Sequence, residues 1–367
     1  MGGLTQLYEV GTGSSFIYGD PVYWTPNGNG VNESYMANAN LTWETTYSHN
    51  LGLDFGFWRN RLSGSVEVYQ NTTEDILMRY PVSGSGYSFQ YRNAGTIRNR
   101  GIEFSVNATV MQKRDFRWNA YANVTYNQNR VIKLATDDPI ESPFMIIEEG
   151  RPFRQFYMRE YAGVDRETGM PLWYLDESGD ETTSDYNAAA KRYMGAADPK
   201  VLGGFGTGIN WKGLDFNMLW SGAAKYTAKY NEVLGNVLAL DSSNSPAFYY
   251  DRWHLADVYD PNSAWIPGKY PATRRTDADN GANRLESNMQ RINAAHARLK
   301  NLELGYTLPA KLLRGSGISK LRCYINLTNP LVICNKYLKE FDPEISDGNG
   351  FQYPLQKSYN LGVNITF

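Results

Sequence analysis

The chain has 367 residues, with 36 Lys and Arg against 38 Asp and Glu and a formal net charge of −2. This balance excludes a general nucleic-acid binder, which needs a basic surface stripe. No stretch approaches the roughly 18 uninterrupted apolar residues of a transmembrane helix, whereas 27 Tyr and 9 Trp suit the aromatic belts of a membrane β-barrel.

The first 40 residues are rich in Gly, Asn, Ser and Tyr and show no sustained period. We expect residues 1–40 to form an extracellular loop or a truncated strand region. The opening decapeptide has neither the charged region nor the apolar region of a signal peptide. An outer-membrane protein needs such a peptide, so either the chain is a piece of a longer protein or the barrel interpretation fails.

Apolar and polar residues then alternate strictly in nine segments. In the first, Leu51, Leu53 and Phe55 alternate with Gly52 and Asp54. A period of two predicts β-strands with one apolar and one polar face. The nine segments cover residues 51–57, 62–69, 102–110, 118–126, 205–211, 214–220, 302–308, 321–327 and 358–367.

Short connections between these segments alternate with long ones, as in an outer-membrane barrel with short periplasmic turns and long external loops. The alternation requires zero or two strands between residues 116–133 and 203–211. Segments 151–164 and 170–176 supply two, which makes about eleven strands. An odd number cannot close with every neighbour antiparallel, and an open sheet leaves edges that lipid does not tolerate. The predicted fold class is therefore all-β, an antiparallel transmembrane β-barrel present only in part.

The last strand favours a membrane barrel because it alternates to the end and stops on Phe367. Its apolar residues would face lipid and its Asn residues would face a wet lumen. The alternative is a soluble β-rich carbohydrate-binding or adhesin domain, in which the apolar face would be buried in a protein core.

Other motifs predict little chemistry. The Gly-rich run 203–208 lacks the following helix and the Lys of a phosphate loop, and strand alternation continues through it. His49, His254 and His296 have no metal-ligand spacing, and the acidic turn 176–180 lacks the closing acid of a calcium loop. Cys323 and Cys334 would lie roughly 33–36 Å apart along an extended chain, so we expect two unpaired thiols. With no nucleophile–base pair, we expect no enzyme, cofactor or metal site.

Aromatic side chains in the long loops are the candidate ligand-binding residues. Exposed rings of this kind stack on sugars or pack against a partner protein. The alternative is that they belong to the interfacial belt or to packing between loops. The candidates are Tyr23, Trp24, Tyr249, Tyr250, Trp253 and Trp265.

Several motifs together resemble the SusC/RagA-type TonB-dependent outer-membrane transporters. The most specific is residues 298–309, R-L-K-N-L-E-L-G-Y-T-L-P. The others are residues 41–45 with 50–56, 93–95 with 99–103, 149–152, 163–165 with 168–171, 342–344 (D-P-E), 353–354 and the terminal strand. The resemblance covers residues 41–367 in the order of the family.

This resemblance implies a 22-strand barrel in the outer membrane, filled by an N-terminal plug, that imports glycans or peptides with energy from the TonB complex. It also implies a SusD-like surface lipoprotein as a lid. Residues 41–367 would form the C-terminal part of the barrel, without the plug through which TonB acts. The chain by itself should therefore transport nothing, and its sequence does not identify the cargo.

Overall fold

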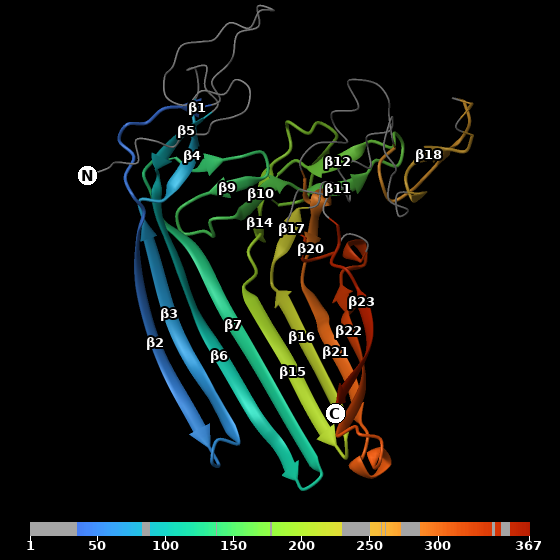
Figure 1. Cartoon of the computed structure of the whole chain (residues 1–367). Coiled ribbons are helices and arrows are strands. Elements are labelled where there is room, and N and C mark those ends of the chain that lie inside the picture. Colours follow the sequence, from blue (N-terminus) through green and yellow to red (C-terminus); the bar gives the residue numbers. More distant parts are fainter. Residues whose placement is uncertain are drawn as a thin grey trace, which may run out of the picture.

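A nine-stranded antiparallel sheet dominates the computed structural model (Figure 1). The structure describes residues 35–82, 89–136, 138–176, 178–229, 250–257, 259–260, 262–272, 287–339, 342–345 and 353–367. The strands follow the order β2 (Thr45–Phe57), β3 (Leu62–Glu74), β6 (Gly95–Lys113), β7 (Phe116–Leu134), β15 (Val201–Trp211), β16 (Leu214–Ala224), β21 (His296–Thr307), β22 (Lys320–Cys334) and β23 (Ser358–Thr366). All nine strictly alternating segments lie in this sheet, which confirms the predicted all-β, antiparallel architecture.

The two further segments are strands, but they do not join the large sheet. Strand β7 pairs directly with β15, so zero strands lie between them and not two. Strand β10 (Gln155–Arg159) pairs with β9 (Met145–Ile147) and β14 (Lys191–Ala196), and β11 (Tyr161–Val164) pairs with β12 (Pro171–Tyr174). The prediction of eleven strands in one sheet was wrong, because these segments pair within two small separate sheets and bury their apolar side chains there. Phe156, Met158 and Trp173 are completely buried or nearly so.

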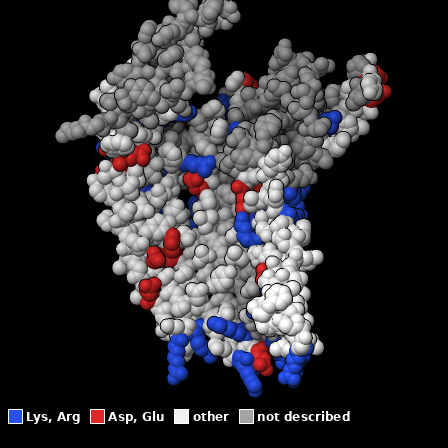
Figure 2. Space-filling view, viewed as in Figure 1, with Lys and Arg blue, Asp and Glu red and all other residues white. Residues whose placement is uncertain are grey.

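The two ends of the sheet differ. At one end the connections are short, and the turn between β15 and β16 has positive φ at Lys212 (48°) and Gly213 (90°), as a type I′ hairpin turn requires. Figure 2 shows that Lys and Arg gather at this end. The other end carries the small sheets and loops. Their remaining elements are β1 (Tyr35–Met36), β4 (Leu77–Pro81), β5 (Phe89–Asn93), β8 (Ile140–Glu141), β13 (Thr182–Thr183), β17 (Thr227–Lys229), β18 (His254–Leu255), β19 (Trp265–Ile266), β20 (Arg291–Asn293) and the short 3-10 helices η3 (Asn288–Gln290) and η5 (Lys336–Leu338). A third 3-10 helix, η4 (Ala310–Leu313), lies at the short-turn end.

The apolar face of the large sheet is exposed. Leu51 is 78% exposed and Leu361 is 84% exposed, and both lie on strands whose other face is polar. The register carries the same face across the sheet, because Leu51 is opposite Val68 and Val68 is opposite Ile102. Among the described residues, no helix is long and apolar enough to cross a membrane. An exposed apolar face does not favour the soluble-domain alternative, which needs this face inside a core.

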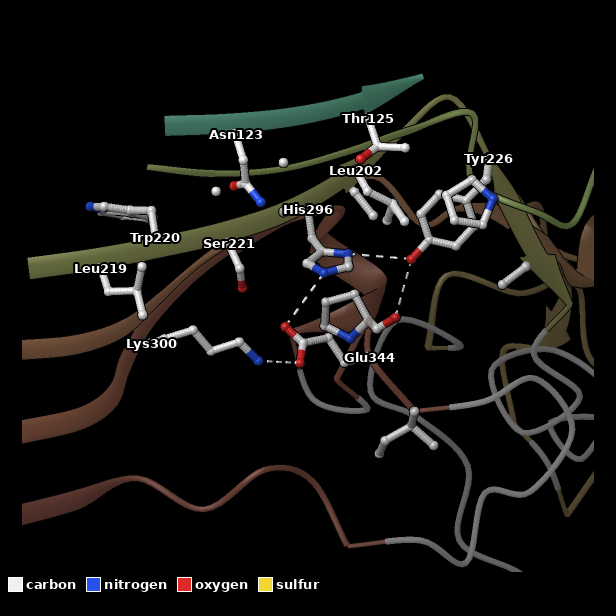
Figure 3. A pocket seen from close by; sticks show the side chains of 18 of the residues that line it. Asn123, Thr125, Leu202, Leu219, Trp220, Ser221, Tyr226, His296, Lys300 and Glu344 are labelled. Carbon is white, nitrogen blue, oxygen red and sulfur yellow. Dashed lines mark hydrogen bonds and ion pairs between the residues drawn. The ribbon is translucent and has the colours of Figure 1, made fainter. Parts of the chain in front are cut away.

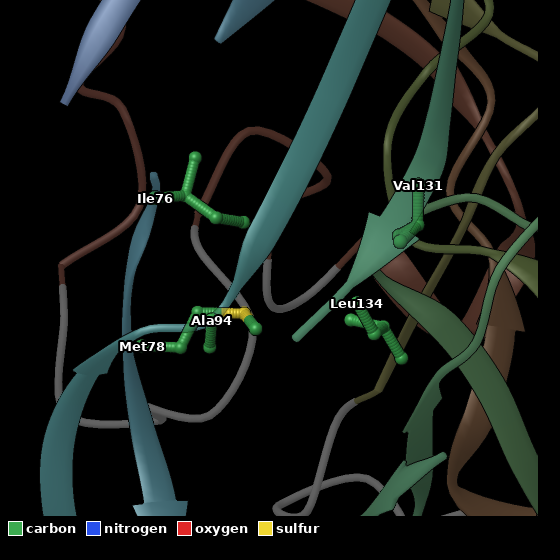
Figure 4. Close-up of a cluster of buried hydrophobic side chains, with 5 residues drawn as sticks. All are labelled: Ile76, Met78, Ala94, Val131 and Leu134. Atoms are coloured by element: carbon green, nitrogen blue, oxygen red, sulfur yellow. The ribbon is translucent and has the colours of Figure 1, made fainter. Parts of the chain in front are cut away.

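The buried hydrophobic residues lie at the end of the sheet with the long connections. One cluster joins the ends of β6 and β7 to the small sheet of β4 and β5 (Figure 4). Its members are Ile76, Met78, Ala94, Val131 and Leu134. This packing fixes the small sheet of β4 and β5 to the end of the large sheet.

Gly101 on β6 permits a close cross-strand contact on the polar face. A Cβ atom there would lie 2.3 Å from the backbone oxygen of Tyr126 and 2.7 Å from the hydroxyl of Tyr69. The Tyr69 hydroxyl passes this position to donate a hydrogen bond to Asn127 Oδ1 at 2.8 Å. Gly52, on β2 of the same face, has nothing closer than 3.4 Å.

We therefore expect Gly101→Ala to destabilise the folded protein by about 1–3 kcal/mol, as overpacking does. Gly52→Ala is the matched control, and it should leave stability unchanged or slightly higher because Ala has less conformational freedom to lose. Urea titration of the protein in detergent, followed by tryptophan fluorescence, measures both. Equal midpoints for the two variants would contradict the contact at Gly101.

Candidate functional site

The polar face of β2, β3, β6 and β7 lines a cavity of roughly 860 Å³ near the long-connection end. Amide side chains dominate this lining, and amides both donate and accept hydrogen bonds. The amides are those of Asn50, Asn71, Asn99, Asn127 and Asn129. Hydrogen bonds between neighbours hold part of the lining in place, since Asn129 donates to Asn99 Oδ1 at 2.9 Å and accepts from the Phe153 amide at 2.7 Å.

Two carboxylates face each other in this lining. Glu67 on β3 is the direct cross-strand partner of Glu103 on β6. The Asn50 amide donates to Glu67 at 3.3 Å, and no described Lys or Arg forms an ion pair with either carboxylate. Like charges directly opposite each other are unfavourable. This pair therefore favours the approach of a positively charged group.

A second cavity of roughly 640 Å³ continues the same surface toward β16 and β21 (Figure 3). The two cavities share Thr125, Pro199 and Leu202. Asn123 and Ser221 add an amide and a hydroxyl to the second lining. Together the two cavities form a continuous surface, which we call the lumen wall. It carries amides, hydroxyls and charged side chains beside apolar ones such as Leu202 and Leu219.

An ion-pair cluster borders the second cavity, whose lining includes His296, Lys300 and Glu344. Arg298 on β21 is 1% exposed and pairs with Asp342 and with Glu344, the latter at 2.9 Å. Lys300 reaches Glu344 at 2.5 Å, and His296 Nε2 lies 3.5 Å from the same carboxylate. The cluster holds residues 342–345 against the end of β21.

The charge of Glu344 is stabilised by its partners. Burial by itself would raise the pKa of Glu344, but hydrogen bonds from Lys300 and Arg298 outweigh burial and hold the pKa below its ordinary value. A carboxylate with a lowered folded-state pKa contributes stability that is complete above its unfolded-state pKa, which is about 4.3 for Glu. That contribution is lost as the pH falls through the lower, folded-state value.

We therefore expect residues 342–345 to loosen from β21 as the pH falls below about 4. Limited proteolysis of the protein at a series of pH values, with an acid-active protease, measures cleavage near this segment. Glu344→Gln should be cleaved faster at neutral pH and should show a weaker dependence on pH. If the cleavage rate of the variant depended on pH as strongly as that of the wild type, Glu344 would not control the attachment of residues 342–345 to β21.

The predicted aromatic ligand residues are only partly described. Tyr250 is 81% exposed and Trp265 is 42% exposed, whereas Trp253 is 4% exposed. Trp253 packs against Gly169, and its ring centroid lies 5.8 Å from that of Trp265. Three of the predicted residues, Tyr23, Trp24 and Tyr249, lie outside the described residues. Ligand binding by these aromatic residues stays a prediction.

Other expectations about the sequence can now be compared with the structure. The Gly-rich run 203–208 lies inside β15, as its alternation indicated. Cys323 and Cys334 are free thiols, as predicted. In the acidic turn 176–180, the Gly179 amide donates to Asp176 Oδ1 at 2.9 Å. Among the described residues, no group of three His, Cys, Asp or Glu side chains is arranged to hold a metal ion.

Sequence reasoning missed the charged residues of the lumen wall. Residues 298–309 and 342–344 are separate motifs in the sequence, and nothing in their spacing indicates that Arg298 contacts Asp342. Glu67 and Glu103 lie on strands that a long connection joins. A long connection does not fix which residues of the two strands face each other, whereas a short turn does. Their place on the polar face was the one available signal.

An exposed apolar face, a polar inner face and external loops at one end define the wall of an outer-membrane β-barrel. The family model described as "TonB dependent receptor-like, beta-barrel" matches residues 3–330. The chain belongs to this family of outer-membrane receptors, as the resemblance to SusC/RagA-type transporters implied.

Relatives and solved structures agree with this assignment. The TonB-dependent receptor P3 of Formosa agariphila is 27% identical over 92% of this chain and 36% of the relative. The TonB-dependent receptor SusC of Bacteroides thetaiotaomicron is 26% identical over 96% of this chain and 34% of the relative. The structure of the RagAB peptide transporter superimposes with a TM-score of 0.73 and 30% identity, over 95% of this chain and 38% of that one. The chain therefore spans little more than a third of the length of the proteins that it matches.

Proposed function

We propose that this chain forms the C-terminal barrel wall of a TonB-dependent importer for peptides. The observation that carries the proposal is the lumen wall, a continuous surface rich in amides and charged side chains on the inner side of a sheet whose outer side is apolar. Such a wall offers a hydrated path lined by amides and carboxylates. The 30% identity with the RagAB peptide transporter supports peptides as cargo.

The chemistry of the lumen wall also favours a peptide over a neutral glycan. Amide side chains exchange hydrogen bonds with peptide groups, but they bind sugar hydroxyls as well. The Glu67 and Glu103 pair distinguishes the two, because peptides carry amino groups and basic side chains. A neutral oligosaccharide can donate hydrogen bonds to the two carboxylates, but it brings no positive charge to offset their mutual repulsion.

The proposal includes two partners. The TonB complex would supply energy through an N-terminal part of the receptor outside this chain. A SusD-like surface lipoprotein would cover the end with the long loops, where Tyr250 and Trp265 expose their rings. These rings would contact the lipoprotein or the entering cargo.

Uptake by whole cells tests the proposal. Cells that express the complete receptor should accumulate a fluorescent basic peptide, and cells without it should not. The double variant Glu67→Gln/Glu103→Gln should reduce uptake of the basic peptide about tenfold, and uptake of an acidic peptide much less, because two favourable charges are removed. Glu74→Gln, which removes a carboxylate from the outer face of β3, is the matched control. Uptake of a neutral oligosaccharide in place of both peptides would overturn the proposed cargo.

A further inference from the structure

The outer, lipid-facing side of the sheet changes character within a few residues near the long-connection end. A first cross-strand row on this face is apolar, and a second is polar. The third row is basic on two of its four strands. The rows are Leu51, Val68, Ile102 and Tyr126; then His49, Gln70, Arg100 and Gln128; then Tyr47, Thr72, Arg98 and Arg130.

The first two rows line a groove of roughly 630 Å³ on the outer face. All eight of their side chains contribute to its lining. The floor is apolar, and Leu51, Val68 and Ile102 remain 78%, 52% and 45% exposed. The groove is thus an apolar depression with polar side chains along one edge.

One arginine, Arg100, lines that edge, and two more, Arg98 and Arg130, stand one row beyond it. Arg98 is the direct cross-strand partner of Arg130, and Arg100 follows two residues along the same face of β6. Arg100 donates to Gln128 Oε1 at 2.9 and 3.1 Å. Within the described part of the chain, none of the three forms an ion pair, and Glu74, the outward carboxylate at the end of β3, does not reach them. Two unpaired like charges directly opposite each other are unfavourable without an anion between them.

The change from apolar to basic side chains along the strands matches the change from acyl chains to head groups in a bilayer. Two residues along a strand advance about 6.6–6.8 Å, so the basic row stands roughly 13 Å along the strands from the apolar row. Of the three rows, the basic one is nearest to the ends of β6 and β7 that pack against the small sheet of β4 and β5. A lipid of the outer leaflet would therefore meet the apolar groove with its acyl chains and the arginines with its head group.

We propose that this groove binds a phosphate-bearing acyl lipid of the outer leaflet. The guanidinium groups of Arg98, Arg100 and Arg130 bind the phosphate oxygens through charge-assisted, bidentate hydrogen bonds. The apolar row below them packs against one or two acyl chains. A partner protein is a poorer fit, because the groove is continuous with the face that lies against lipid.

Native mass spectrometry of the complete receptor tests this inference. The receptor is purified in detergent, stripped of lipid, and mixed with lipid A that carries two phosphates. The triple variant Arg98→Gln/Arg100→Gln/Arg130→Gln should retain at least tenfold less of this lipid than the wild type. The matched control removes three arginines from the short-turn end, Arg59→Gln/Arg61→Gln/Arg114→Gln, and should retain as much as the wild type.

Two further arms identify the chemistry. Dephosphorylated lipid A should bind the wild type and the triple variant equally weakly, which assigns the lost affinity to phosphate. Inorganic phosphate in large excess should not displace the lipid, which shows that the acyl chains contribute. Equal retention by the wild type and the triple variant would overturn the proposal, and complete displacement by inorganic phosphate would replace it with a soluble anion. If the triple variant does not fold, the single exposed change Arg130→Gln should still lower retention severalfold.

Discussion

Arg298→Met should destabilise the folded receptor by about 3–5 kcal/mol, because it removes one partner of a buried ion-pair cluster. The Arg298 side chain is 2% exposed and that of Asp342 is 5% exposed. Without the guanidinium, the Asp342 carboxylate stays buried with no cation beside it. The Glu344 carboxylate keeps Lys300, so most of the cost falls on Asp342.

The measurement is the urea midpoint of the receptor in detergent, together with limited proteolysis of residues 335–345. Lys300→Met is the matched control, since Lys300 is 32% exposed and an exposed pair contributes only about 0–1 kcal/mol. Adding Asp342→Asn to Arg298→Met should recover part of the loss, because it removes the unpaired charge. Equal effects of Arg298→Met and Lys300→Met would show that burial does not determine the contribution of this cluster.

The second large effect concerns the outer face. Val124 lies near the middle of β7, is 42% exposed and points to the lipid side, whereas its neighbour Asn123 lies on the lumen wall. Val124→Arg should destabilise the receptor by about 2–4 kcal/mol, the cost of a basic side chain near the middle of a bilayer. Asn123→Arg places the same group one residue away in a wet lumen and should cost less than about 1 kcal/mol.

The comparison is made in lipid vesicles, by denaturant titration of folding into the bilayer. The two variants differ by one position and by the face that they occupy, so their difference isolates the environment of each face. If Asn123→Arg and Val124→Arg lowered the free energy of unfolding by the same amount, the two faces of the sheet would not differ in their access to water.

The strands of the large sheet could be predicted from the sequence, because the alternation of apolar and polar residues is a local property. Residues 51–57 and 358–367 show a period of two without reference to any other segment, and short turns such as 212–213 set the register between neighbouring strands. The same reasoning failed for residues 155–159 and 171–174. These segments also have strand character, but which strand they pair with depends on long-range packing.

The functional site was harder to predict for the same reason. Alternation placed Asn123 and Glu103 on the polar face. It did not reveal the cavities that these two residues line. The contact between Arg298 and Asp342 joins residues 44 positions apart in the sequence. No pattern along the chain encodes that pairing, because a long connection separates the two motifs.

The most direct test of the whole account is the accessibility of spin labels in lipid vesicles. Single cysteines are placed at positions 360, 361, 362 and 363 of β23 in a receptor without its native thiols, and each label is exposed to oxygen and to a water-soluble nickel complex. Labels at Leu361 and Val363 should collide with oxygen dissolved in the acyl chains, and labels at Asn360 and Gly362 with aqueous nickel. Collision rates that do not alternate along the strand would contradict a sheet that separates lipid from a wet lumen.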